Sequence, residues 1–312
     1  MMLRRRASAA AAPDPILAMF ASGDAMPDTW LELSPHQDYK DDLLVRLRRT
    51  SDNAEADFSF SELEDGTAAT WVGLGNNGVM RTWYGTAGAM QTGDQDAVDE
   101  QPIVINSSGG FFRESVFSSG DHVRTLFNQT MNMSDFCYTT VFRTRMDQST
   151  VIGITEGNND ITFLFLLNRL GVKNKDGTPG DFGFTHFNLS TVTATDFGID
   201  KMGIYGNRNV VTAGIKNGKA FIYHNADPII EKVVATPQGN DLVDFDMGGR
   251  NGGQMEGAFS AHFEHHDGCP DESVITALHE ELIRKYEVLE ISLISSTTVV
   301  PNTDPDGGTA FG

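Results

Sequence analysis

Short segments that alternate apolar and polar side chains recur through most of the chain, and they restrict its fold more than any other feature. In the segment "FCYTTVFRTR", Phe136, Tyr138 and Phe142 share one face of an extended strand. Such alternation is typical of a strand that is buried on one side. A second segment, "NVVTAGIKNGKAFIYHN", carries Asn217 and Gly218 between two apolar runs, which indicates a hairpin with a two-residue type I′ turn. We therefore expect mainly antiparallel β structure.

One segment near the C-terminus has clear helical spacing instead. Its apolar residues recur at intervals of three and four: Ile275, Leu278, Leu282, Tyr286 and Leu289. Pro270 suits a first helical position, and the acidic pair that follows it suits the positive end of a helix. Many short strands with one late helix predict an all-β fold, a two-sheet antiparallel jelly-roll sandwich with one short C-terminal helix and extended terminal arms.

The two ends of the chain differ in composition from the part between them. Residues 1–38 are rich in Ala, Pro, Asp and Met without a sustained period, and residues 291–312 have the pattern of an extended tail. We assign residues 39–290 to the sandwich domain and residues 1–38 to an N-terminal docking arm. Four apolar side chains are expected to dock this arm on another protein: Ile16, Leu17, Met19 and Phe20. A disordered terminus is the alternative that the same composition allows.

The charge balance excludes some classes of partner. Acidic residues outnumber basic ones by 43 to 23, which gives a formal net charge of −20. Binding to nucleic acid or to anionic lipid requires a basic surface, whereas neutral sugars are indifferent to net charge. No run approaches the ~20 apolar residues that span a bilayer, and no apolar region of ~7–15 residues follows the first arginines. We expect a soluble, unprocessed chain without a nucleic-acid or membrane partner.

The cysteine and histidine residues of the chain allow disulfide and metal chemistry to be considered from their spacing. Cys137 and Cys269 lie far apart in the sequence, so one disulfide can form, but a chain made in the cytoplasm favours two free thiols. The segment "EHHDGCP" suggests a metal site around His265 and His266. Adjacent residues on a strand point to opposite faces, and no CxxC or HxxxH partner occurs. We therefore expect no metal site and no cofactor.

Two blocks of the sequence resemble a known family. "VRLRRTSDNAEADFSF" and "RTWYGTAGAMQTGDQDAVDEQPIVINSSG" are similar to the concanavalin A-like, or laminin-G-like, jelly-roll domain of phage structural proteins. The hairpin segment and "DMGGRNGGQMEGAFSAHFEH" are similar to strands that many lectin-like sandwiches share. The resemblance implies a virion protein made in the host cytoplasm: a head spike or decoration protein, or a neck or tail-fibre component. It also implies other virion proteins as partners of the arm, host polysaccharide as a ligand, and a homo-oligomer, with a trimer expected for a fibre or spike.

The same two blocks also resemble the catalytic sandwich of B-type α-L-arabinofuranosidases. In that family a Gly-Gly-Asp-Asn stretch supplies the general acid/base, and this chain has Arg250 at the Asp position. Because an arginine cannot exchange a proton near neutral pH, it cannot replace that carboxylate. The nearest counterpart of the nucleophile is Glu156, in a poorly matching context. This departure predicts that the chain keeps the frame of the family without its catalysis, and so is not an enzyme.

Four residues are candidates for contact with a sugar: Trp83, Tyr84, Arg250 and Asn251. The two aromatic rings could stack on a sugar ring, while Arg250 and Asn251 could bind hydroxyl groups. A tryptophan in a sandwich strand also belongs commonly to the core, and a Gly-rich stretch such as the one before Asn251 serves turns as well as ligand sites. Two further alternatives stay open: a free carbohydrate-binding module, and a glycosidase of the arabinofuranosidase type with rearranged acids.

Overall fold

The structure is a computed structural model that describes residues 13–21, 26–86, 92–118, 121–130, 132, 135–144, 149–156, 161–167, 182–188, 191–196, 208–233, 242–248 and 257–288. Within these residues the strands are β1 (Thr29–Glu32), β2 (Leu43–Arg49), β3 (Glu55–Ser59), β4 (Gly78–Trp83), β5 (Gly93–Asp94), β6 (Ile103–Ile105), β7 (Phe111–Phe117), β8 (Val123–Thr130), β9 (Phe136–Thr144), β10 (Ser149–Glu156), β11 (Ile161–Leu167), β12 (Phe182–Asn188), β13 (Thr191–Asp196), β14 (Asn209–Lys216), β15 (Lys219–His224), β16 (Asp227–Val233), β17 (Leu242–Met247) and β18 (Gly257–His265). The helices are α1 (Pro15–Ala21), α2 (Phe60–Glu64), α3 (Thr67–Val72), the 3₁₀ turn η1 (Val98–Glu100) and α4 (Glu272–Lys285).

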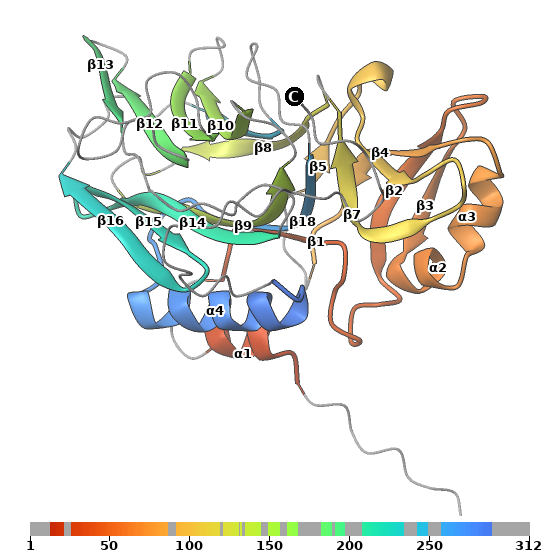
Figure 1. Ribbon diagram of the computed structural model, residues 1–312, viewed down its shortest axis with the longest axis horizontal. Helices are drawn as coiled ribbons and strands as arrows, with labels where there is room; N and C mark the ends of the chain where they lie inside the picture. Colours follow the sequence, from red (N-terminus) through yellow and green to blue (C-terminus); the bar gives the residue numbers. More distant parts are fainter. Residues whose placement is uncertain are drawn as a thin grey trace, which may run out of the picture.

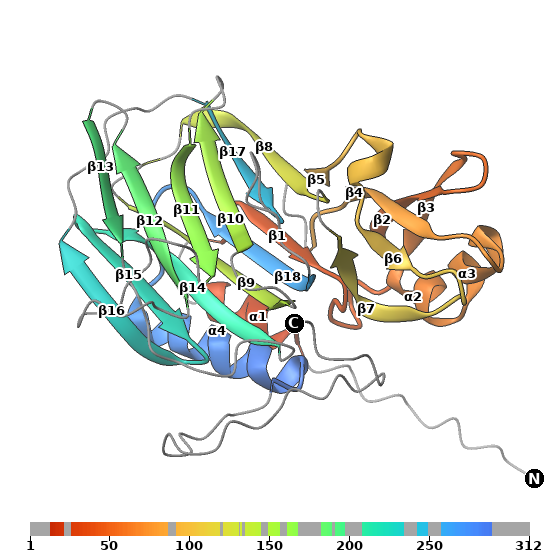
Figure 2. The same cartoon turned by 45° about the horizontal axis from the view of Figure 1, so that its top comes forward.

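The strands form a sandwich of two antiparallel sheets with a smaller sheet at one end (Figures 1 and 2). Hydrogen-bonded pairing gives the order β16-β15-β14-β9-β18-β1 in one sheet. The other sheet has the order β13-β12-β11-β10-β17-β8-β5. The smaller sheet, β3-β2-β4-β6-β7, joins the first through β7–β18 and the second through β4–β5. The predicted all-β sandwich is confirmed.

Helices α1 and α4 cover the outer face of the β9–β18 sheet (Figure 1). Side chains alternate along β18, so Ala261 and Phe263 point toward these helices and pack with Leu278 and Leu282. The late helix is therefore confirmed. It begins at Glu272 with Asp271 as its N-cap residue, so Pro270 lies just before the helix and not at its first position. None of the helices in the described ranges is long and apolar enough to cross a membrane.

The predicted hairpin and the predicted β9 strand are both present. Asn217 and Gly218 have φ values of 52° and 71°, and Lys216 pairs with Lys219 across the turn. Both central residues are thus left-handed, as a type I′ turn requires. Strand β9 lies between β14 and β18 in the middle of its sheet, so both of its edges are hydrogen-bonded.

The N-terminal segment packs on the chain's own sandwich. Ile16 and Phe20 of α1 are each 1% exposed and belong to one apolar cluster with Trp30 and Leu278. Leu17 and Met19 pack, partly buried, against the same cluster. Strand β1 pairs with β18, so residues before 39 already belong to the sheet. The apolar anchors assigned to docking on another protein are therefore used within the chain, because the outer face of β18 needs an apolar cover.

Two short helices that the sequence patterns did not predict follow strand β3. Ser59 caps α2 through a reciprocal capping box with Glu62, in which each side chain bonds to the other residue's backbone N–H. Gly66, with φ of 84°, starts α3, and Gly73 ends it. Both helices are shorter than two full turns, and their apolar residues Phe60, Leu63 and Val72 pack into the main core.

Candidate functional site

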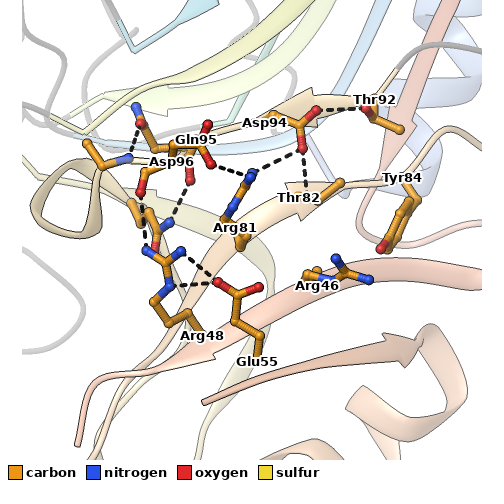
Figure 3. A network of polar contacts seen from close by, with 12 residues as sticks. Arg46, Arg48, Glu55, Arg81, Thr82, Tyr84, Thr92, Asp94, Gln95 and Asp96 are labelled. Carbon is orange, nitrogen blue, oxygen red and sulfur yellow. Dashed lines mark hydrogen bonds and ion pairs between the residues drawn. The ribbon is translucent and has the colours of Figure 1, made fainter. Parts of the chain in front are cut away.

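Four polar residues lie directly opposite one another on neighbouring strands at the junction of the smaller sheet and the sandwich. Asp57 on β3 pairs with Arg46 on β2. Arg46 pairs in turn with Thr82 on β4, which pairs with Asp94 on β5. Directly paired residues share a face of the sheet, so the four side chains form one line across four strands. We call Asp57, Arg46, Thr82 and Asp94, together with Tyr84 and Arg81, the polar row; Figure 3 shows most of it.

Hydrogen bonds link the members of the polar row. Arg46 donates from Nε and Nη2 to the two carboxylate oxygens of Asp57, at 2.8 and 2.9 Å. The Tyr84 hydroxyl donates to Asp57 Oδ1 at 2.7 Å. At the other end, Thr82 Oγ1 donates to Asp94 Oδ1 at 2.6 Å. These contacts hold each carboxylate in a fixed orientation, with planar Arg–carboxylate geometry at one of them.

A β-bulge brings Arg81 into the row. Thr82 lies opposite Arg46, but Met80 lies opposite Leu47, so Arg81 is an extra residue on β4. Met80 remains fully buried in the core. The Arg81 guanidinium reaches Asp94 at 3.3 Å and also pairs with Asp96, as Figure 3 shows. Bulges commonly re-aim one side chain next to a functional site, and here two successive residues of β4 contact the same carboxylate.

A second set of contacts fixes the segment that follows Asp94. Arg48 donates to Glu55 Oε1 at 2.9 and 2.6 Å and to the carbonyl of Asp96 at 3.2 Å. Gln95 donates to the carbonyl of His122, which is the residue before β8. Side chains from several strands thus fix the backbone that carries the polar row. We therefore expect the row to rearrange little on ligand binding.

The protonation states suit recognition rather than proton transfer. The hydrogen bond from Arg46 holds the pKa of Asp57 below its usual range, against the effect of burial. Burial and the hydrogen bond to Asp57 raise the pKa of Tyr84 to about 12. Near neutral pH Asp57 is thus a carboxylate and Tyr84 a neutral hydroxyl donor. Neither group exchanges protons readily at that pH.

The row is accessible to a ligand. The side chains of Arg46 and Asp57 are 41% and 30% exposed, and those of Arg81 and Asp94 are 22% and 37% exposed. The row presents guanidinium donors, carboxylate acceptors, a hydroxyl and an aromatic ring on one rigid face. Sugar hydroxyls can hydrogen-bond to this mixture of donors and acceptors. A partly exposed tyrosine ring can pack against the apolar face of a sugar ring.

The structure separates the four predicted sugar-contact residues. Tyr84 belongs to the polar row. Trp83 points the opposite way and is 0% exposed in the core, so its ring is not available for stacking on a sugar; alternation along β4 is the physical reason. Arg250 and Asn251 lie outside the described residues, as do the glycines beside them. Whether that stretch is a turn or a ligand site therefore stays a prediction from the sequence. Arg46 was not predicted as a site residue, although the alternation in "LLVRLRR" places its side chain on the same face as that of Arg48.

One carboxyl group with a raised pKa lies near the row. Burial raises the pKa of Asp121 to about 6, although the Ser118 N–H donates to its Oδ2 at 2.6 Å. The next residue, His122, accepts a hydrogen bond from Gln95 at its carbonyl. The carbonyl of Asp121 lies close to Gly248, the residue that follows β17. A carboxyl group of this kind keeps its proton into the weakly acidic range, as a general acid requires.

The "EHHDGCP" segment carries a buried hydrogen-bond network. Glu264 points between the sheets, where its carboxylate contacts His262 Nε2 at 2.7 Å and His266 Nε2 at 3.1 Å. His265 instead lies beside the ring of Phe20, with a centroid distance of 5.5 Å. Residues adjacent on the strand thus diverge, as expected. Among the described residues, no group of three or more His, Cys, Asp or Glu side chains could hold a metal ion.

The comparisons with known proteins give a fold and no family. No family model matches the sequence, and no curated protein matches it. A mutant GH54 α-L-arabinofuranosidase soaked with 4-nitrophenyl α-L-arabinofuranoside aligns over 91% of this chain and 68% of its own, with a TM-score of 0.63 and 11% identity. An arabinofuranosidase complexed with arabinofuranosyl-α-1,2-xylobiose covers the same shares, with a TM-score of 0.65 and 12% identity. A Trypanosoma rangeli sialidase in complex with the inhibitor DANA covers 65% of this chain and 32% of its own, with a TM-score of 0.40 and 8% identity.

These similarities support one part of the family resemblance and correct another. The chain has the β-sandwich fold of these two arabinofuranosidase structures. The prediction that it is not an enzyme is contradicted, because the structures that match it over 91% of its length are enzymes. The relation to phage structural proteins receives no support from these matches, and the virion location, the trimer and the virion partners stay predictions. At 11–12% identity the similarity establishes the fold, and activity remains to be argued from the site.

Proposed function

We propose that this chain is a carbohydrate-active sandwich that binds glycans containing arabinofuranose along the polar row. The observation that carries the proposal is the row itself, in which the partly exposed Asp57, Arg46 and Asp94 lie in one line across neighbouring strands, together with the buried Thr82. The fold shared with arabinofuranosidases supports the choice of sugar. Arg46 would donate to a sugar oxygen from Nη1, because its Nε and Nη2 already bind Asp57. The Tyr84 hydroxyl, whose proton goes to Asp57, would accept from a sugar hydroxyl, and so would Asp94.

Calorimetric titration with arabinofuranosyl xylo-oligosaccharides tests the binding. We expect Arg46→Gln to weaken the affinity about 10-fold or more, because one charge-assisted hydrogen bond contributes roughly 1.5–3 kcal/mol. Arg284→Gln is the matched control. It also removes an arginine with a carboxylate partner, Glu281, but lies on α4, away from the row. Equal affinity in the wild-type protein and the Arg46→Gln variant would refute the row as the binding face.

Hydrolysis of the bound glycoside is a second candidate function, favoured by Asp121. A glycosidase needs one carboxyl group that stays protonated to donate to the leaving oxygen. Asp121 has the raised pKa for this role and adjoins Gly248, the residue that precedes the stretch containing Arg250. We expect release of nitrophenol from 4-nitrophenyl α-L-arabinofuranoside by the wild-type protein. Asp121→Asn should abolish that release while leaving oligosaccharide binding in place. Absence of turnover at millimolar substrate across pH 4–8 would remove this candidate and leave the binding proposal intact.

A further inference from the structure

The two cysteines of the chain, which are distant in sequence, meet in one apolar cluster. Cys137 lies on β9, and Cys269 lies in the segment between β18 and α4. They pack together with Phe221, Tyr223 and Ile275. Both are free thiols in this structure. Cys137 is 1% exposed and Cys269 is 8% exposed, so the pair is almost completely enclosed.

Backbone contacts fix the two segments against each other. Strands β9 and β18 are paired so that Cys137 lies opposite His265. Beyond the end of β18, the N–H of Cys269 donates to Asp135 Oδ1 at 2.9 Å, and the N–H of Gly268 donates to the carbonyl of Asp135 at 2.8 Å. Asp135 is two residues before Cys137. The relative position of the two cysteines is therefore set by the fold and not by the contact between their side chains.

The environment of the thiol groups limits their reactivity in the folded chain. The Cys269 thiol donates to the carbonyl of Ile215 at 3.7 Å. Burial and the neighbouring Cys137 thiol raise the pKa of Cys269 well above its usual range. In the folded chain Cys269 is accordingly a protonated thiol and a poor nucleophile. Any reaction of the pair must therefore occur while this region is open, during folding or local unfolding.

We propose that Cys137 and Cys269 form a disulfide bond when the chain folds in the presence of a small-molecule disulfide such as oxidised glutathione. Cys269 loses a proton and attacks one glutathione sulfur, which forms a mixed disulfide and expels one glutathione thiolate. Cys137 loses a proton and attacks the Cys269 sulfur, which forms the protein disulfide and expels the second thiolate. The two protein thiols are oxidised by two electrons in total, glutathione disulfide is reduced to two thiols, and those thiols take up the two protons.

The cross-link would tie the centre of the β9–β18 sheet to the segment that leads into α4. Its loop includes all the strands from β10 to β18, so the unfolded chain would lose much conformational freedom. The bond requires the two sulfurs to approach to about 2.05 Å. A disulfide at this place would also keep the cover provided by α4 attached to the sandwich.

The test uses the full chain, unfolded in urea and refolded either with oxidised glutathione or with dithiothreitol. Free thiols are then alkylated under denaturing conditions and counted by mass spectrometry, and the melting temperature is measured for both preparations. We expect no alkylated cysteine after oxidative refolding, a Cys137–Cys269 cross-linked peptide after proteolysis, and a melting temperature several degrees above that of the reduced chain. Cys269→Ala is the control, in which the melting temperature should not respond to the oxidant.

Two results would overturn the proposal. One is two alkylated cysteines, or stable glutathione adducts, after oxidative refolding. The other is a cross-link found only between two chains. A variant that fails to fold would not affect the test, because the first measurement compares two preparations of the wild-type chain.

Discussion

Thr125 Oγ1 on β8 donates a hydrogen bond of 2.8 Å to Glu264 Oε1 on β18, and it thereby joins the two sheets of the sandwich through a charged group at their centre. Thr29 donates to the other carboxylate oxygen at 2.5 Å. Burial alone would raise the pKa of Glu264, but hydrogen bonds from His262 and His266 outweigh it and leave the pKa at about 2. A buried carboxylate is tolerated here because its oxygens are fully engaged.

Thr125→Val should destabilise the protein by roughly 1.5–3 kcal/mol, because a hydrogen bond to a charged group is lost inside the core. Thr140→Val is the matched control. Thr140 is also completely buried, but its hydroxyl donates to a backbone carbonyl, that of Ala261, so a smaller loss of about 1 kcal/mol is expected. Urea unfolding followed by tryptophan fluorescence compares the two. Equal losses would mean that the charge on Glu264 adds nothing to the inter-sheet contact.

Acid should destabilise the protein through His279 of α4. Burial is the main cause that lowers the pKa of His279 to about 3, and the neutral ring accepts from the Ala226 N–H at 2.9 Å and contacts Thr212 Oγ1 at 2.7 Å. Because the folded pKa lies below the unfolded value of 6.5, this contribution is complete above pH 6.5 and is lost as the pH falls toward 3. His279→Leu should be less stable at pH 7 but should show a smaller loss between pH 6.5 and 4. His36→Gln, in the segment before β2, is the control; a wild-type slope in His279→Leu would contradict the assignment.

Asp121 should make the folded protein relatively more stable as the pH falls from 6 to 4, which is opposite to the effect of His279. Its folded pKa of about 6 lies above the unfolded value of 3.8, so its favourable contribution is present below pH 3.8 and is lost as the pH rises through 6. Asp121→Asn keeps an oxygen that can accept from the Ser118 N–H and removes the titration. We expect the variant to equal or exceed the wild type in unfolding free energy at pH 7, with the difference shrinking toward pH 4. Greater stability of the wild type at pH 7 would show that the ionised form is favoured after all.

Phe20→Ala should destabilise the whole sandwich and not only helix α1. The ring is 1% exposed and lies edge-on to Trp30 at 6.4 Å, so truncation leaves a cavity under α1 and costs about 3–5 kcal/mol. Leu17→Ala, a partly buried position on the same helix, should cost less. A single cooperative transition with a lowered midpoint is the expected result. If Phe20→Ala left the midpoint unchanged, the N-terminal segment would be a separate arm, as its composition first indicates.

The parts of the fold that could be predicted are those with a local signal. The type I′ hairpin rests on Asn217 and Gly218, and helix α4 rests on its own apolar spacing. The polar row could not be predicted as a unit, because it depends on the register of four strands and on the bulge at Arg81, which no local pattern specifies. Trp83 and Tyr84 look alike as candidate sugar contacts in the sequence. Adjacent side chains point to opposite faces of the strand, and only the packing of β4 decides that Trp83 faces the core and Tyr84 faces the row.

The way the smaller sheet is attached has a mechanical consequence. It is hydrogen-bonded to one sheet of the sandwich through β7–β18 and to the other sheet through β4–β5. Sliding of one large sheet past the other would therefore strain both of these hydrogen-bond ladders at once. A pulling force applied at this end of the molecule would be shared between the two sheets. The end that carries the polar row should therefore resist shear better than the opposite end. The edge strands β13 and β16 lie at that opposite end.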